Sequence, residues 1–130
     1  VLAGALRELH WNAGGVAVDP TSLRAFGGAA PVTPAADDLS LYLNDGSTLL
    51  ALSNGSVRTI GTFSLVPTAL VQAGGYVAAV EIYGATPTQP RYQVETLNKT
   101  GGSPILVEPP ATTLQLLAGS DRGLILAGTP

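Results

Sequence analysis

Two turn dipeptides constrain the fold of this chain more than any other feature of its sequence. Asp45-Gly46 and Asn54-Gly55 bracket one short apolar run in the stretch LNDGSTLLALSNGS, residues 43–56. Both dipeptides supply the positive-φ residues that tight two-residue hairpin turns need, and the flanking runs have the composition of strands. The spacing therefore predicts an antiparallel β-meander, with strands over residues 39–43, 48–52 and 57–63.

Further short strands are predicted over residues 76–83, 91–97 and 123–127, separated by the loop sequences GATPTQP and NKTGG. The first eleven residues fit either a short helix, with leucines at helical spacing, or a strand over residues 6–11. Short strands with turn signals between them are typical of an all-β fold made of antiparallel meanders.

Composition limits both the size and the chemistry of the protein. The 130 residues suffice for a single β-rich domain, and we expect it to be part of a longer, exported protein because the chain contains no Met. Charged residues make up 12% of the chain, about half of the ~25% usual in soluble domains. The net charge of -3 argues against a nucleic-acid partner, and no apolar run is long enough to predict membrane insertion. The absence of Cys excludes disulfides and thiolate metal sites.

Three segments of the chain share one pattern, in which an apolar entry is followed by an Ala-Gly turn and an apolar strand. They begin at Leu9, Leu70 and Leu114. The last two turns lie 45 positions apart, as do Ile60 and Ile105. A period near 45 residues with about four strands matches one blade of a β-propeller, and it divides the chain into copies of roughly 6–38, 39–83 and 84–130.

The order of strands and small turns resembles the blades of TolB-like β-propellers. HWNAGGVAVD is the closest local match, with Trp11 in the place of the blade's aromatic residue. The later copies have Val71 or Leu116 there, and Gly-Gly or Ser-Asp replaces the Asp-Gly turn of the family. The resemblance implies four-stranded blades, and about three of them would not close a ring.

A second resemblance covers the same residues. Residues 37–60 followed by YVAAVEIY are similar to the sheet of a minor pilin or pseudopilin whose membrane helix has been removed. The opening residues would then be the stub of the pilin's helical spine. This resemblance does not explain the repeat.

No group of residues has the spacing of a catalytic or metal site. His10 is the only His, and no G-x-S-x-G sequence accompanies it. Glu81, Glu95 and Glu108 lie on or beside different strands, and we expect the first two on exposed faces. Asp37-Asp38 and Asn44-Asp45 lack the alternating oxygen ligands of a calcium loop. The sequence therefore predicts no enzyme activity and no cofactor.

The function that remains is a structural or protein-interaction module of an exported or envelope protein. Its partners would be other protein chains or further copies of itself. The turns around Asp45, Asn54 and Lys99 are the predicted interaction sites. A subunit of a filament or coat, either pilin-like or a viral surface protein, is the alternative function.

Overall fold

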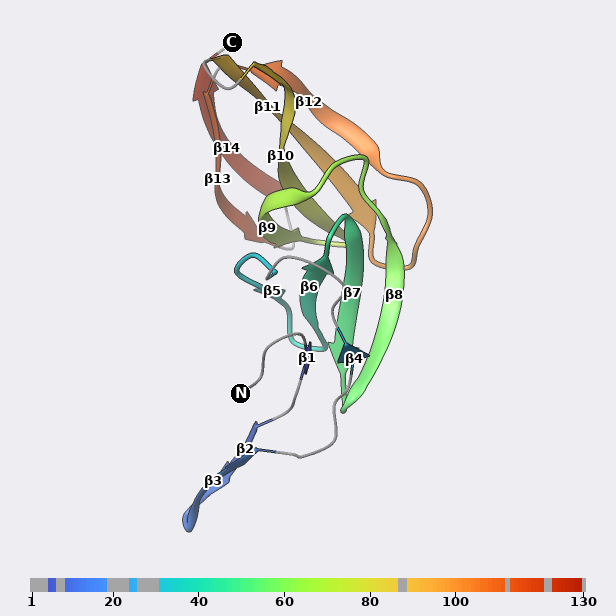
Figure 1. The fold of residues 1–130 in the computed structure, drawn as a ribbon, viewed down its shortest axis with the longest axis vertical. Coiled ribbons are helices and arrows are strands. Elements are labelled where there is room, and N and C mark those ends of the chain that lie inside the picture. The colour runs from blue at the N-terminus through green and yellow to red at the C-terminus, as the bar shows by residue number, and fades with distance from the viewer. Residues whose placement is uncertain are drawn as a thin grey trace.

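The computed structural model describes residues 5–6, 9–18, 24–25, 31–86, 89–111, 113–120 and 123–129, and the side chains of residues 13–15, 31–82, 91–107, 119 and 123. All regular secondary structure in these residues is β-strand, so the all-β prediction is confirmed (Figure 1). The helix predicted for the first eleven residues is wrong at the positions that the structure describes, because β1 (Ala5–Leu6) and β2 (Leu9–Asn12) are strands. Within the described residues, no helix is long and apolar enough to cross a membrane.

The first sheet is the meander that the two turn dipeptides predict. Its strands follow chain order, all antiparallel: β5 (Ala35–Ala36), β6 (Leu41–Asp45), β7 (Thr48–Ser53) and β8 (Ser56–Thr62). The φ angle is 58° at Gly46, 50° at Asn54 and 73° at Gly55. These left-handed conformations are the reason that Gly and Asn occupy the turns.

The second sheet repeats this order of strands. It contains β9 (Pro67–Ala73), β10 (Tyr76–Thr86), β11 (Gln89–Asn98) and β12 (Ile105–Ala111), again antiparallel and consecutive. The strands β10 and β11 contain the predicted ranges 76–83 and 91–97, whereas β9 and β12 were not predicted as strands.

The main hydrophobic core lies between the two sheets. The first sheet and the residue after it contribute Tyr42, Leu49, Ala51, Ile60 and Phe63, among others, and the second contributes Leu70, Val77, Ala79 and Leu97. The sheets therefore pack face to face, as in other sheet-on-sheet folds.

A third layer covers part of the outer face of the second sheet. The hairpin of β13 (Thr113–Ser120) and β14 (Gly123–Thr129) lies against β9, β10 and β11. On that face Ala78, Val80 and Val94 form a second buried cluster.

The first strands of the first sheet, the second sheet and the third-layer hairpin lie next to one another. β5 contacts β9 and β9 contacts β13, while β8 and β12 lie on the opposite side of the view in Figure 1. The remaining pairs are β1 with β4 (Arg24–Ala25) and the hairpin of β2 with β3 (Gly15–Val18).

The propeller-like repeat stays a prediction, and the structure places the two isoleucines of its 45-residue spacing, Ile60 and Ile105. Ile60 lies in β8 and Ile105 in β12, which are the fourth strands of the first and second sheets. The Asn54-Gly55 turn and the NKTGG loop each connect a third strand to a fourth. The sheets themselves begin near residues 35 and 67, so the predicted copy boundaries at 39 and 84 do not coincide with them.

Candidate functional site

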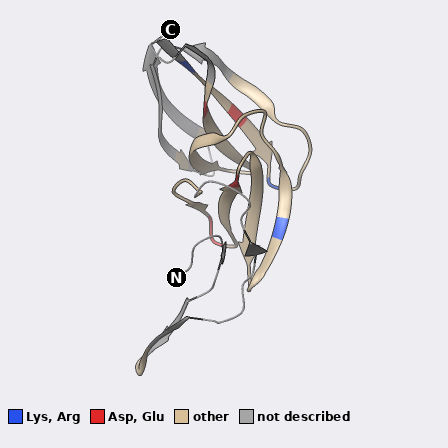
Figure 2. Cartoon of the chain, viewed as in Figure 1, with Lys and Arg blue, Asp and Glu red and all other residues tan. Residues whose placement is uncertain are grey.

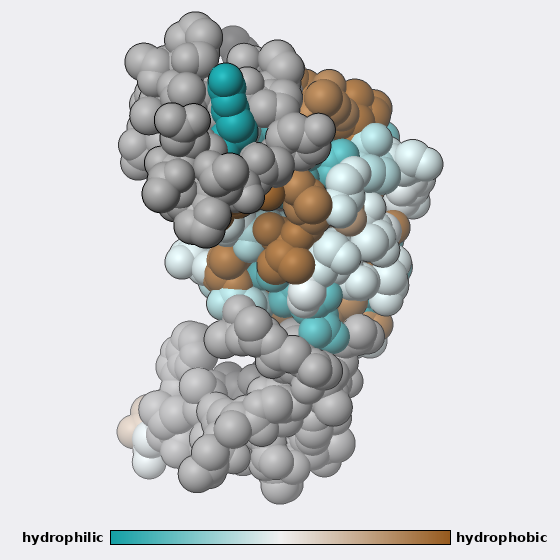
Figure 3. Space-filling view, turned by 45° about the horizontal axis from the view of Figure 1, so that its top comes forward, coloured by the Kyte–Doolittle hydropathy of each residue, from teal (hydrophilic) through white to brown (hydrophobic). Residues whose placement is uncertain are grey.

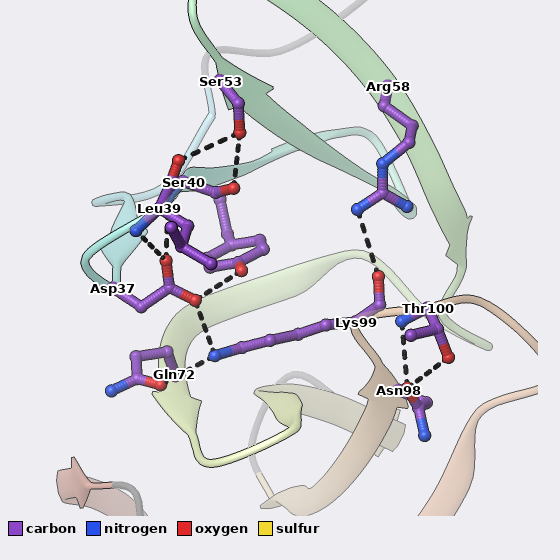
Figure 4. Close-up of polar contacts among 10 residues, drawn as sticks. Asp37, Leu39, Ser40, Ser53, Arg58, Gln72, Asn98, Lys99 and Thr100 are labelled. Carbon is purple, nitrogen blue, oxygen red and sulfur yellow. Dashed lines mark hydrogen bonds and ion pairs between the residues drawn. The ribbon is translucent and has the colours of Figure 1, made fainter.

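A polar cluster centred on Asp37 connects the two sheets (Figure 4). Asp37 follows β5 and receives hydrogen bonds at Oδ2 from the hydroxyl of Tyr42, at 2.6 Å, and from Lys99 Nζ, at 2.7 Å. Lys99 follows β11 in the second sheet, and its Nζ also donates to Gln72 Oε1 at 3.0 Å. The guanidinium of Arg58, on β8, donates to the carbonyl of Lys99 at 3.2 Å. We call Asp37, Tyr42, Gln72 and Lys99 the Asp37 cluster.

The carboxyl group of Asp37 is held in its charged form. Burial alone would raise its pKa, but hydrogen bonds from Lys99 and Tyr42, and from the backbone N–H groups of Leu39 and Ser40, lower it well below its usual range. Burial and the bond to Asp37 raise the pKa of Tyr42. A carboxylate with four donors, one of them the ammonium of Lys99, is a structural tie between the sheets.

A second polar group lies at the joint between the sheets. Glu81 on β10 and Gln93 on β11 are register partners, and Glu95 follows two residues later on the same face. All three side chains are buried, with Glu81 fully so. Gln93 Nε2 donates to Glu81 Oε2 at 2.9 Å. Glu95 accepts two bonds from Ser64, one from its N–H and one from its hydroxyl, both at 2.8 Å.

The two carboxyl groups lie on the same face of the second sheet and shift each other's pKa, and a hydrogen bond between them requires that they share a proton. Burial, followed by the bond to Glu95 and its charge, raises the pKa of Glu81 to about 8. For Glu95, burial acts in the same direction, but the bonds from Glu81 and Ser64 outweigh it and lower the pKa. Glu81 is therefore the protonated member at neutral pH. We call these two residues the Glu81–Glu95 pair.

The expectation that Glu81 and Glu95 lie on exposed faces is wrong. Both belong to the face of the second sheet that packs on the first, in line with the core residue Ala79. A sequence signal existed, because the run Val77–Val80 is apolar at every position and such runs are typical of strands covered on both faces. Glu81 directly continues this run and is buried by the layers that cover it.

The outer strand of the second sheet carries exposed aliphatic side chains. Ile105, Leu106 and Val107 are 55%, 51% and 45% exposed, and β12 is an edge strand within the described sheets. Figure 2 shows that charged residues are sparse on the strands, and in Figure 3 apolar patches interrupt a weakly polar surface. Exposed apolar side chains on an edge strand favour contact with other protein chains.

The three predicted interaction turns do not form one surface. Asp45 and Asn54 lie in consecutive hairpin turns of a meander, at opposite ends of β7. Lys99 lies in the turn after β11, but its side chain is 16% exposed and engaged by Asp37. The interaction role of these turns stays a prediction.

Other sequence candidates give no site within the described residues. The side chains of His10 and Glu108 lie outside the part of the chain whose side chains are described. Among the described residues, no three His, Cys, Asp or Glu side chains are placed to hold a metal ion. In the 37–45 region, Asn44 Oδ1 accepts a hydrogen bond from the backbone N–H of Val32, which ties the strand β6 to the segment before β5.

Comparisons with protein-family models, curated proteins and solved structures give no match to this chain. The described polar clusters join the sheets to each other, and three consecutive exposed apolar residues, Ile105–Val107, lie on an outer strand.

Proposed function

We propose that the chain is a non-enzymatic structural or protein-interaction module, built as a propeller-like array of four-stranded sheets. One observation carries the proposal. Ile60, in the fourth strand of the first sheet, is buried against the second sheet, whereas its counterpart Ile105 in the second sheet is 55% exposed. The second sheet thus carries apolar surface at the position where the first sheet has a covering neighbour.

The stacking of the sheets supports the array. Two consecutive four-stranded meanders face each other, and a hairpin that follows them covers the next face. The first strands β5, β9 and β13 are successive neighbours, as the inner strands of adjacent blades would be. The surface of Ile105, Leu106 and Val107 would then receive a further protein segment, either from another chain or from a second copy. The proposed location of the protein outside the cytoplasm rests on the sequence prediction alone.

The test is self-association of the chain, measured by sedimentation velocity over a range of protein concentrations. We expect concentration-dependent dimers or larger species, and Ile105→Lys should shift them to monomer because it places a charge in the apolar surface. Thr59→Lys is the matched control, since Thr59 is exposed on the fourth strand of the other sheet. A wild-type chain that stays monomeric at every concentration would contradict this route of association.

A subunit of a filament or coat is the second candidate, and the same edge strand favours it. Pairing of β12 with β12 of a second copy would close a dimer, whereas contact with a different surface of the copy would continue into a filament. Light scattering that levels off at the mass of two chains supports the closed module, and scattering that rises without limit supports the filament.

A further inference from the structure

The joint between the sheets contains two buried carboxyl groups, and no described cation shifts the pKa of either one. From β10 and β11 the groups on this face are Glu81, Gln93, Glu95 and the exposed Arg91. From the connection between the sheets they are Ser64 and the backbone N–H of Leu65. The neighbouring strands place Pro67 of β9 opposite Glu81 and Leu106 of β12 opposite Glu95, and neither residue titrates. The charge balance of the joint therefore depends on the pair itself.

Three positive side chains on or beside the two sheets are described. Arg91 lies on β11 on the same face as Glu95, but it is exposed and contributes to the pKa shift of neither carboxyl group. Lys99 and Arg58 are committed elsewhere. Lys99 Nζ is bound by Asp37 and Gln72, and the guanidinium of Arg58 reaches the carbonyl of Lys99. Glu81 Oε1 is fully buried and receives a hydrogen bond from no donor among the described residues. A proton on this oxygen, donated to Glu95, satisfies both carboxyl groups at once.

The partner of Glu95 is the chain segment that links the sheets. Ser64 lies between β8 and β9, and its N–H and hydroxyl both bind Glu95. The adjacent Phe63 is buried in the core between the sheets. The position of Glu95 is thus coupled to the segment that sets one sheet against the other.

We propose that the Glu81–Glu95 pair is a proton-operated lock on the joint between the two sheets. With one shared proton, the pair holds Ser64 and keeps the joint closed. When that proton is lost, two buried carboxylates repel each other, Glu95 moves away from Glu81, and Ser64 is released. The lock acts inside the folded chain and does not depend on any partner.

The sign of the pH dependence follows from the two pKa directions. The pKa of Glu81 is raised from 4.5 to about 8, so its contribution is complete below pH 4.5 and is lost as the pH rises through about 8. Across that window the folding equilibrium constant falls by up to about tenfold for each pH unit. The pKa of Glu95 is lowered, so its contribution is present above 4.5 and is lost as the pH falls. The pair therefore stabilises the fold most in weakly acidic solution.

The decisive variant is Glu81→Gln, which keeps the shape and a donor to Glu95 but has no proton to lose. We expect its stability to urea to change little between pH 5 and pH 9, while the wild type loses stability over the same range. Asp38→Asn is the matched control, because it removes one carboxylate from an exposed position and should keep the wild-type profile. A Glu81→Gln profile that falls in parallel with the wild type would overturn the proposal.

A measurement on the wild-type chain covers the case in which the variant does not fold. Carbon-13 NMR of the Glu81 carboxyl should show a titration near pH 8 in the folded state, accompanied by faster hydrogen exchange at the Ser64 amide. A Glu81 carboxyl that titrates near its ordinary value of 4.5 would exclude the lock. A titration near pH 8 without a change at Ser64 would show that proton loss does not open the joint, and would equally overturn it.

Discussion

At the scale of single residues, the clearest cases are positions whose backbone or charge leaves few alternatives. Gly46 and Gly75 both lie in hairpin turns, and a Cβ atom added at either would meet nothing within 4 Å. They differ in conformation, because Gly46 has a φ of 58° and Gly75 has no positive φ. Because neither position is crowded, a comparison of the two isolates the effect of backbone strain.

We expect Gly46→Ala to lower the free energy of unfolding by about 1 kcal/mol, since an L-residue in the left-handed region costs roughly 1–2 kcal/mol. Gly75→Ala should be neutral or stabilise by up to about 1 kcal/mol, because it reduces the entropy of the unfolded chain. Urea unfolding of both variants measures the difference. Equal effects would mean that the left-handed turn is not what requires glycine at 46.

The Asp37 cluster gives the second prediction at this scale. Lys99→Met keeps the apolar part of the side chain and removes the charge that binds Asp37. We expect a loss of about 1–3 kcal/mol in the free energy of unfolding, because a partly buried carboxylate loses its charged hydrogen-bond donor. Asp38→Asn, at an exposed neighbouring position, should change stability by less than about 0.5 kcal/mol.

The same cluster predicts how stability responds to acid. The pKa of Asp37 is depressed in the folded chain, so the stabilisation is present above its ordinary value of 3.8 and is lost as the pH falls below it. The difference in stability between wild type and Lys99→Met should therefore shrink between pH 4 and pH 2. Thermal unfolding at a series of pH values measures it, and a difference that stays constant with pH would contradict the pairing.

At the scale of elements, what the sequence revealed depended on turn chemistry. The strands β6, β7 and β8 were predictable because Gly46 and the pair Asn54-Gly55 mark both ends of β7. The strand β9 begins with Pro67 and β12 contains Pro109 and Pro110, and proline argues against strand interiors. Both are edge strands of the second sheet within the described residues, where proline is tolerated.

The sites were less predictable than the strands. Lys99 was singled out from its turn, but its partner Asp37 lies 62 positions away and only the packing of the two sheets brings them together. The burial of Glu81 and Glu95 also depends on layers that are distant in sequence. Alternation along one strand shows which residues share a face but does not show whether another sheet covers that face.

The contact between the third layer and the second sheet gives a prediction about one element. A Cβ atom at Gly119 of β13 would overlap the carbonyl oxygen of Gln72 and lie 2.5 Å from a methyl group of Val71. Gly119→Ala should destabilise the fold by about 1–3 kcal/mol, because the obstacle is backbone and one element must shift. Hydrogen exchange should increase in β13 and β14 more than in the first sheet.

Gly123→Ala is the control for this prediction, because Gly123 begins the partner strand β14 and a Cβ atom there meets nothing within 4 Å. Its exchange and stability should match the wild type. If Gly119→Ala left both unchanged, the close approach of β13 to β9 would not exist in solution.

At the scale of the whole molecule, the sheets depend on each other for burial. The core cluster draws side chains from both sheets, and Phe63 lies in the connection that joins them. The Asp37 cluster and the Glu81–Glu95 pair add polar links across the same joint. Neither sheet buries its apolar face alone, so we expect them to fold as one cooperative unit.

Phe63→Ala tests this cooperativity. Phe63 is 2% exposed, and its truncation should lower the free energy of unfolding by about 3–5 kcal/mol through lost burial and the cavity that remains. Val66→Ala, in the same connection but 57% exposed, should change it by less than about 0.5 kcal/mol. Hydrogen exchange in Phe63→Ala should accelerate equally in β6–β7 and in β10–β11, because both sheets lose the same core. Amides that stay protected in one sheet while they exchange in the other would show two independent units, and the joint would then be a contact between domains rather than a shared core.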